Sequence, residues 1–260
     1  MPPSPHELKD VNYIVHGAGM TEPDFCASAP TKVIDTAYFG LRNIFEYAKR
    51  MTAKPVFLFI SSAAVYGDPL RDDCISENGY SCMDPLTVRS IYGESKRICE
   101  TMSMAYSIEY GLPVKIARFS NSFGPGMRLD KGSATADFLA SALKGKDIVI
   151  KSDGTTKREF LYFTDLVSGL FYILLCGGMI EACNIGGGLV HTVKEFAQTV
   201  QEIFREKNIA IKILGCKRLE DQGSPKSKRL NAARLEALGW RSHDIPLYEA
   251  VKRFKMSVED

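Results

Sequence analysis

The stretch Val56-Phe-Leu-Phe-Ile-Ser-Ser-Ala-Ala-Val-Tyr-Gly67 joins a continuous apolar run to two hydroxyl side chains. Such a run, without polar alternation, is typical of a strand buried on both faces of a parallel sheet. The next polar signal is Tyr92-Gly-Glu-Ser-Lys96, in which a phenol and an ammonium share one face of a helix. Because open parallel sheets bind ligands at the carboxyl ends of their strands, we expect Ser61 and Ser62 to meet this helix at a binding site.

The segments around this stretch alternate between strand-like and helix-like patterns. Short apolar runs at Val11–His16 and Val114–Phe119 favour strands, and the spacing of apolar residues over 32–50 and 91–110 favours helices. In the second helix, the residues expected to face inward are Ile91, Ile98, Met102 and Ala105. This order predicts an α/β fold, with a Rossmann-like parallel sheet and helices on both of its faces.

The pattern changes after residue 120, where glycine and proline cluster at 124–126. Shorter strand and helix patterns follow, together with a polar, basic stretch at 215–229 that is predicted to be a loop. We therefore expect a parallel-sheet domain over residues 1–120 and a smaller, mixed C-terminal lobe over residues 121–260 that covers it.

Composition and charge argue against several classes of protein. The 260 residues carry a formal net charge of +2, with 45% hydrophobic and 25% charged residues, so nothing selects nucleic acid as a partner. No apolar stretch approaches the roughly 20 residues of a membrane helix, and the first residues lack the apolar core of a signal peptide. The seven cysteines are scattered and form no metal-ligand cluster. We expect a cytoplasmic protein with reduced thiols, no metal and no membrane partner.

A tyrosine and a lysine four residues apart are a weak motif by themselves. Tyr248 and Lys252 have the same spacing, but no strand-end hydroxyl precedes them, which favours a surface pair. Tyr92 and Lys96 do follow such a hydroxyl. A free tyrosine has a pKa of about 10 and is a poor base, but a nearby ammonium lowers that pKa. Tyr92 would then take the proton of a substrate alcohol held by Ser62, as a hydride passes to a nicotinamide.

Further motifs make the chain similar to a known family. They are His16-Gly-Ala-Gly19, Ser61-Ser-Ala-Ala-Val-Tyr-Gly67, Arg89-Ser-Ile-Tyr-Gly-Glu-Ser-Lys-Arg97, Arg118-Phe-Ser-Asn-Ser-Phe-Gly-Pro125, Arg158-Glu-Phe-Leu-Tyr-Phe-Thr-Asp165, Asn184-Ile-Gly186 and Leu238-Gly-Trp240. Over about residues 10–255 the chain resembles the extended short-chain dehydrogenase/reductases, the NAD-dependent epimerase/dehydratase family acting on nucleotide sugars. In overall likeness it most resembles the UDP-glucuronate decarboxylase branch.

The resemblance implies roles for individual residues and for the two parts of the chain. It makes Ser62, Tyr92 and Lys96 catalytic. The residues that it places at NAD are His16, Gly17, Ala18, Gly19, Ser61, Tyr92, Lys96 and Phe119. Those that it places at the nucleotide-diphosphate sugar are Ser62, Asn121, Arg158 and Arg229. It also implies that residues 1–120 form the NAD-binding domain, that residues 121–260 mainly bind the sugar nucleotide, and that the helices over 32–50 and 91–110 pair in a homodimer.

The catalytic segment departs from the family at one point. The family's dehydratases and decarboxylases place an acid just after the catalytic hydroxyl, whereas this chain has Ala63 and Ala64 there. Alanine can neither donate nor accept a proton, which argues against 4,6-dehydration and decarboxylation. Oxidation and re-reduction of a sugar carbinol remains, and we expect C4 epimerisation. The alternative that stays open is a dehydratase or decarboxylase that works without this acid.

The front of the fold also departs from the family. Its members begin with a strand, a Gly-x-x-Gly-x-x-Gly turn and a helix, whose backbone N–H groups face the pyrophosphate. This chain has no glycines at that spacing and starts at what resembles the fourth strand, which implies an N-terminal truncation of roughly 60–80 residues. Gly186-Gly-Gly188 falls in the wrong lobe to replace the turn. The hypotheses are a fragment of a working enzyme, a catalytically impaired short form that binds a sugar nucleotide or a partner, and an enzyme completed by another chain.

Overall fold

A four-stranded parallel sheet forms the centre of the protein. The computed structural model describes residues 11–67, 74–130, 132–176, 178, 181–215 and 229–259. The strands, in their order across the sheet, are β1 (Tyr13–His16), β2 (Val56–Ile60), β4 (Val114–Phe119) and β8 (Ala182–Ile185). All neighbouring strands run parallel, and Phe59 lies between His16 of β1 and Ile116 of β4. The predicted Rossmann-like α/β fold is confirmed.

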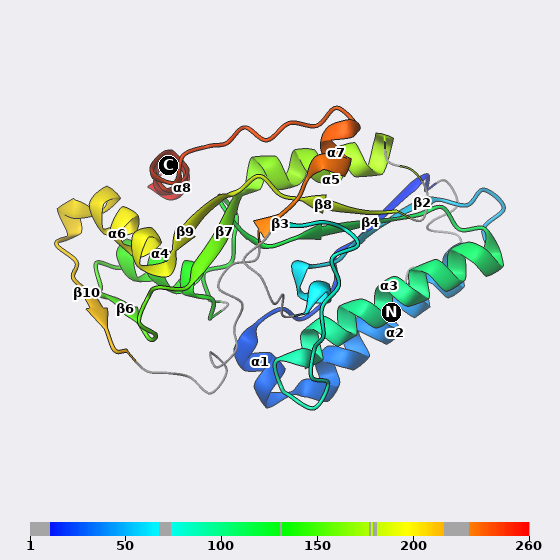
Figure 1. Cartoon of the computed structure of the whole chain (residues 1–260), viewed down its shortest axis with the longest axis horizontal. Coiled ribbons are helices and arrows are strands. Elements are labelled where there is room, and N and C mark those ends of the chain that lie inside the picture. Colours follow the sequence, from blue (N-terminus) through cyan, green and yellow to red (C-terminus); the bar gives the residue numbers. More distant parts are fainter. Residues whose placement is uncertain are drawn as a thin grey trace.

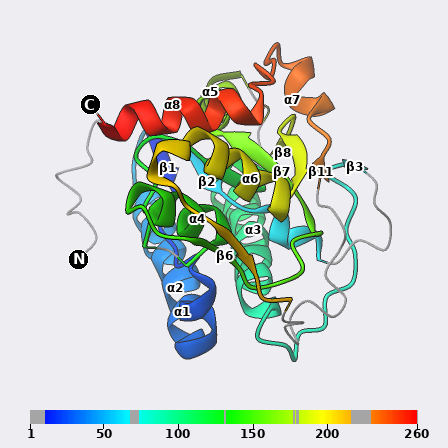
Figure 2. The same ribbon diagram turned by 90° about the vertical axis from the view of Figure 1, so that its left-hand side faces the viewer.

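Helices cover both faces of this sheet (Figure 1). The covering helices are α2 (Pro30–Ala48), α3 (Ser90–Tyr110) and α5 (Phe163–Cys176). The first two lie side by side on one face in both views (Figures 1 and 2), and α5 lies on the other. The side chains of β2 alternate accordingly: Phe57 and Phe59 pack in the cluster that holds Phe45 of α2, whereas Leu58 packs with Ile173 of α5. This burial on both faces explains why β2 is apolar throughout.

The inward face of α3 differs from the one expected. Met102 is buried, but Ile98 is 43% exposed and Ala105 is also exposed, while Ile91 is half-buried. The buried face instead carries small and polar side chains, which are Ser90, Gly93, Ser95, Lys96, Cys99, Ser103 and Ser107. Small residues let α3 approach α2 and the strand ends closely, and their hydroxyls are satisfied locally, as in the bond from Ser103 to the Cys99 carbonyl. A search for apolar residues alone therefore selects the wrong side of this helix.

A smaller lobe of mixed sheets lies beside the main sheet and faces the viewer in Figure 2. Its strands are β5 (Asn121–Phe123), β6 (Ile148–Ile150), β7 (Lys157–Tyr162), β9 (Leu189–Thr192) and β10 (Ile211–Ile213). Its helices are α4 (Ala134–Leu143), α6 (Val193–Ile203) and α8 (Leu247–Glu259). β7 pairs parallel to β5 and antiparallel to β9, so the sheet is mixed as expected. Aromatic packing holds the core, with Phe160 stacked on Phe196 at 4.6 Å between ring centroids.

The chain crosses between the two parts more than once after residue 120. β8 joins the main sheet and α5 packs on it, and Lys115 of β4 donates to the Leu174 carbonyl in the last turn of α5 (2.8 Å). A two-residue ladder also pairs β3 (Cys74–Ile75) with β11 (Arg229–Leu230). The smaller lobe starts with β5 at Asn121, but β8 and α5 belong to the main sheet, so elements after residue 120 contribute to both parts. Most of the predicted loop, residues 216–228, lies outside the described residues.

Short helices complete the described part of the chain. They are α1 (Pro23–Ser28), η1 (Ala63–Tyr66), η2 (Arg205–Lys207) and α7 (Ala233–Ala237).

Among the described residues, no helix combines the length and the apolar character needed to cross a bilayer. The six cysteines in the described part of the chain are free thiols, and the seventh, Cys216, falls outside it. Tyr248 and Lys252 lie on the exposed side of α8, as expected for a surface pair.

Candidate active site

The ends of β1 and β2 meet one face of α3, and Lys96 lies at the junction. Its side chain is 5% exposed, and its Nζ donates to the Ile60 carbonyl at 2.8 Å. The ammonium also lies 5.0 Å from the ring centroid of Phe59 and 5.9 Å from that of Tyr92. A Cβ built on Gly19 would be 3.8 Å from the same Nζ, so the loop after β1 passes beside it. The structure therefore brings the loop over residues 16–19 and the tyrosine helix together.

Ser62 follows β2 directly and begins the short helix η1. Its backbone is extended, with φ −152° and ψ 154°, and its Oγ accepts a hydrogen bond from the Ala64 N–H at 3.1 Å. That contact is an N-cap, which satisfies one of the free N–H groups of the turn. The hydroxyl proton of Ser62 can be donated to the oxygen of Tyr92. Cap formation thus orients the serine toward the tyrosine.

Burial favours the uncharged form of both Tyr92 and Lys96. It raises the pKa of Tyr92, and the Ser62 hydroxyl opposes this rise. Burial also lowers the pKa of Lys96, and the charges of Cys99 and Glu100 oppose this fall. The net shift for Tyr92 is opposite to the one expected from an adjacent ammonium, because the loss of hydration on burial is its largest cause.

His16, at the end of β1, is 4% exposed and lies against the rings of Phe57 and Phe59. Burial and the nearby Lys96 lower its pKa to about 4, so the imidazole is neutral at physiological pH. Its Nε2 has no hydrogen-bond partner among the described residues. The glycines that follow it expose backbone without side chains beside Lys96. An unpartnered nitrogen, open backbone and an ammonium fit the nicotinamide end of a dinucleotide.

The pyrophosphate end of a dinucleotide has no such match in the described residues. The glycines at 186–188 serve packing instead, because a Cβ on Gly186 would be 2.2 Å from the Leu230 carbonyl oxygen and one on Gly188 2.7 Å from that of Phe160. These glycines allow the close approach of backbone segments and do not form a phosphate cradle. The expectation that they cannot replace the glycine-rich turn is consistent with this packing.

A cavity of about 320 Å³ lies in the smaller lobe and contains two of the expected substrate residues. Asn121 of β5 and Arg158 of β7 both line it. Arg229 does not: it is exposed on β11, and its charge acts on the buried carboxyl of Glu159. The structure therefore unites Asn121 and Arg158 in one cavity and places Arg229 elsewhere.

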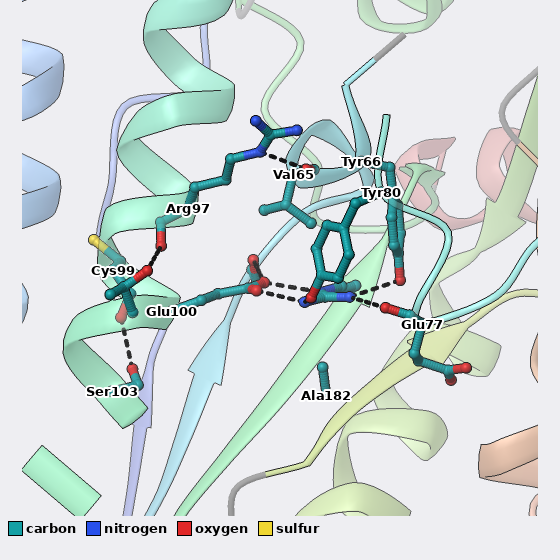
Figure 3. Close-up of polar contacts among 12 residues, drawn as sticks. Val65, Tyr66, Glu77, Tyr80, Arg97, Cys99, Glu100, Ser103 and Ala182 are labelled. Carbon is teal, nitrogen blue, oxygen red and sulfur yellow. Dashed lines mark hydrogen bonds and ion pairs between the residues drawn. The ribbon is translucent and has the colours of Figure 1, made fainter. Parts of the chain in front are cut away.

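One buried network was not recognised from the sequence. Glu100 of α3, labelled in Figure 3, accepts two hydrogen bonds from Arg118 of β4. It also accepts one from the Ser61 hydroxyl at 2.5 Å. The Ser61 side chain, expected at NAD, is thus turned into the interior. The sequence did hold a signal, because Glu100 continues the four-residue spacing of Tyr92 and Lys96.

The family model described as the NAD dependent epimerase/dehydratase family matches residues 5–186, which is more than half of the chain. The chain belongs to this family. As a family member, the protein is an NAD-dependent enzyme of the nucleotide-sugar class, and the expected cofactor is confirmed.

The curated relatives of this epimerase/dehydratase family protein include several decarboxylases. UDP-glucuronic acid decarboxylase 3 of Arabidopsis thaliana is 34% identical over 256 residues, which cover 96% of this chain and 72% of the relative. UDP-glucuronic acid decarboxylase 1 of Danio rerio is 31% identical over 245 residues, or 94% of this chain and 56% of the relative. The overall likeness to the decarboxylase branch is confirmed.

Solved structures of several family activities share this fold. A UDP-glucose 4-epimerase from Thermotoga maritima, solved with UDP-glucose, aligns with a TM-score of 0.82 at 23% identity, covering 95% of this chain and 77% of that one. A dTDP-glucose 4,6-dehydratase from Streptomyces venezuelae aligns with a TM-score of 0.83 at 23% identity, covering 98% and 75%. At this identity the structures establish the fold, and they do not distinguish between the two activities.

Proposed function

We propose that this protein interconverts the C4 epimers of a nucleoside diphosphate sugar. The observation that supports this reaction is the pair of alanines inside the catalytic segment, Ala63 and Ala64. The segment between Ser61 and Gly67 contains no aspartate or glutamate that could act as a general acid. Epimerisation needs no such acid, because a proton and a hydride leave the sugar carbinol and return to it.

The roles of the side chains follow from their places at the end of β2. Ser62 holds the sugar hydroxyl, and Tyr92 takes its proton as the alcohol is oxidised. Tyr92 must be a phenolate to take this proton, and the ammonium of Lys96 favours that charged form, which returns when Tyr92 gives the proton back during the reduction. When bound, NAD supplies the acceptor and then the donor of the hydride. For an epimer to result, the oxidised sugar must present its other face before it is reduced.

The smaller lobe would hold the nucleotide part of the substrate. Arg158 and Asn121 line the same cavity, and a guanidinium can bind two oxygens of a diphosphate at once. The cavity volume of about 320 Å³ falls at the small end of the range for organic ligands. Anchoring the diphosphate here leaves the sugar to reach the candidate catalytic residues.

Decarboxylation of a nucleoside diphosphate hexuronic acid is the second candidate. It is favoured by the curated relatives, since UDP-glucuronic acid decarboxylases are 34% identical over nearly the whole chain. The two alanines are the observation against it. The candidates therefore differ in product, which makes them separable by one assay.

The test is to incubate the purified protein and NAD with UDP-glucose, UDP-galactose or UDP-glucuronic acid and to follow the sugar by proton NMR. We expect the C4 epimer of one of them to accumulate until equilibrium. Release of carbon dioxide with formation of a UDP-pentose would establish decarboxylation instead. Tyr92→Phe is the matched variant: it should retain binding of the sugar nucleotide, measured by calorimetry, and lose turnover.

The same samples address the short-form hypothesis. A titration with NAD, followed by quenching of protein fluorescence, measures whether this chain binds its cofactor. Binding of a sugar nucleotide without binding of NAD would support a form that recognises substrates without catalysis.

A further inference from the structure

Three side chains on one face of α3 each contact the end of β2. Tyr92, Lys96 and Glu100 follow one another at four-residue spacing, so successive turns of the helix meet residues 60–62. The contacts are Tyr92 with the Ser62 hydroxyl, Lys96 with the Ile60 carbonyl (2.8 Å) and Glu100 with the Ser61 hydroxyl (2.5 Å). The candidate catalytic serine is thus preceded by two residues that the helix holds directly.

A buried ion pair fixes the position of Glu100. Arg118 is 2% exposed, and its Nε and Nη2 donate to the two carboxylate oxygens of Glu100 at 2.9 and 2.5 Å. The other acceptors of this guanidinium are the Tyr66 hydroxyl (2.9 Å), the Glu77 carbonyl (2.9 Å) and the Tyr80 hydroxyl (2.7 Å). Figure 3 shows these groups converging from α3, η1 and the loop that precedes α3. Every N–H of the guanidinium is used, so the carboxylate has little freedom to turn.

Glu100 also supplies a charge near Lys96. The titratable groups facing Lys96 are Tyr92, Cys99 and Glu100 on α3 and His16 on β1. The pKa of His16 is about 4 and that of Cys99 is raised to about 11, so both are neutral between pH 6 and 9. In that range Glu100 is the anion that favours the ammonium form of Lys96.

We propose that Glu100, locked by Arg118, is a positioning residue for the candidate catalytic centre: it holds Ser61 so that the next residue, Ser62, faces Tyr92. The carboxylate serves a second purpose, because it keeps Lys96 charged against the effect of burial. The inference rests on the catalytic roles proposed above for Ser62, Tyr92 and Lys96.

The first test measures Lys96 without any need for turnover. Protein labelled with ¹³C-lysine is titrated by NMR, and Lys96→Arg identifies the signal. Glu100→Gln should lower the pKa of Lys96, whereas Ser61→Ala, which keeps the carboxylate, should leave it unchanged. Ser103→Ala is the matched control, because Ser103 is buried on the same helix and its hydroxyl donates to the Cys99 carbonyl of that helix. An unchanged Lys96 titration in Glu100→Gln overturns the electrostatic part of the proposal.

The second test separates positioning from general stability. With the substrate identified in the epimerase assay, Glu100→Gln should reduce kcat by about tenfold or more and leave KM within about twofold. Removing the carboxylate lowers the pKa of Lys96, so the ammonium is lost at lower pH and the alkaline limb of the kcat profile shifts downward. Ser61→Ala should reduce kcat without this shift, and Ser103→Ala should do neither.

A third variant guards against loss of the fold. Glu100→Gln leaves Arg118 as a buried charge without its partner, whereas Glu100→Gln/Arg118→Met removes both charges. If the double variant folds with wild-type kcat, the positioning role is refuted. A wild-type protein that turns over none of the sugar nucleotides would refute the proposed function, but the NMR titration would still decide whether Glu100 supports Lys96.

Discussion

Burial is the largest cause of the pKa shifts of Tyr92 and Lys96 in the candidate site. Both side chains lose hydration on folding, which raises the pKa of Tyr92 and lowers that of Lys96, so the neutral form of each is favoured. Their mutual attraction should therefore matter most when Tyr92 gives up or regains a proton. A spacing argument identified both residues, but the direction of these shifts depends on the surrounding atoms and could not be read from spacing.

The cavity in the smaller lobe allows a prediction for Arg158. Arg158→Ala removes charge-assisted hydrogen bonds to the proposed diphosphate, each of about 1.5–3 kcal/mol, so KM for the sugar nucleotide should rise by roughly 10–100-fold. The kcat value should change little, because Ser62, Tyr92 and Lys96 do not line the cavity that holds Arg158. Steady-state kinetics and calorimetry with the nucleotide diphosphate alone measure the effect.

Arg229→Ala is the matched control for this prediction. Arg229 was also expected at the substrate, but it does not line the cavity. Its loss should therefore leave KM within about twofold of the wild type. An equal rise of KM in both variants would show that the diphosphate binds outside the cavity that holds Arg158.

At the scale of the element, α3 has one buried face and one exposed apolar face. One face meets β2 through small and polar residues, and the other exposes Ile98 and Ile108, which are 43% and 73% exposed. Neighbouring α2 exposes Ile34 and Phe39, at 45% and 50%. Apolar residues on two adjacent helices fit the pairing expected from the family, but the homodimer stays a prediction.

A charge on the outer face of α3 tests this pairing. Ile108→Glu would place a carboxylate in the expected four-helix interface, where it loses hydration without a partner. We predict that the wild type is a dimer and that this variant is a monomer of about the 28.8 kDa chain mass. Light scattering after size exclusion measures the mass.

Val258→Glu on α8 is the control for the dimer test, since Val258 is also exposed, at 44%. It should leave the mass of the wild type unchanged. A monomeric wild type would contradict the expected assembly, and a dimeric Ile108→Glu would place the interface elsewhere.

At the scale of the whole molecule, Glu159 lies where the two parts of the chain join. It is 1% exposed on β7, and it accepts hydrogen bonds from the Ser120 hydroxyl (2.9 Å) and the Leu230 N–H (3.3 Å). Burial raises its pKa to about 7. Glu159 of β7 thus joins Ser120, which follows β4 of the main sheet, to Leu230 at the end of β11.

This shift predicts how stability depends on pH. The folded protein keeps a proton on Glu159 that the unfolded chain releases near its ordinary pKa of 4.5, so the stabilisation is present below that pH. It is lost as the pH rises through about 7, with a total effect of about 3 kcal/mol. Glu159→Gln removes this dependence. Relative to the wild type, its free energy of unfolding should increase by about 3 kcal/mol between pH 4.5 and pH 8.

Urea unfolding of both proteins across this pH range tests the prediction. His16 acts in the opposite direction, because its lowered pKa removes stability as the pH falls from 6.5 toward 4. Both proteins carry His16, so their difference isolates Glu159. A difference that does not vary with pH would mean that Glu159 titrates normally in the folded state.

The sequence by itself determined the fold class, the family and the candidate catalytic residues. Val56–Ile60 is apolar throughout because both faces of its sheet are covered, and the Tyr92 and Lys96 spacing follows from the pitch of a helix. These are local signals, since each depends on residues that are near neighbours in the chain. They can be recognised in the sequence without knowing how distant segments pack.

Only the tertiary structure decided which polar groups share a buried environment. Ser61, Glu100 and Arg118 come from a strand end, a helix and the next strand, and their network forms because these elements converge at one edge of the sheet. The same holds for the return of β8 to the main sheet and for the separation of Arg158 from Arg229. Contacts between distant segments remove water from ionisable groups and thereby disfavour their charged forms. The pKa values and the hydrogen-bond partners therefore depend on the tertiary structure.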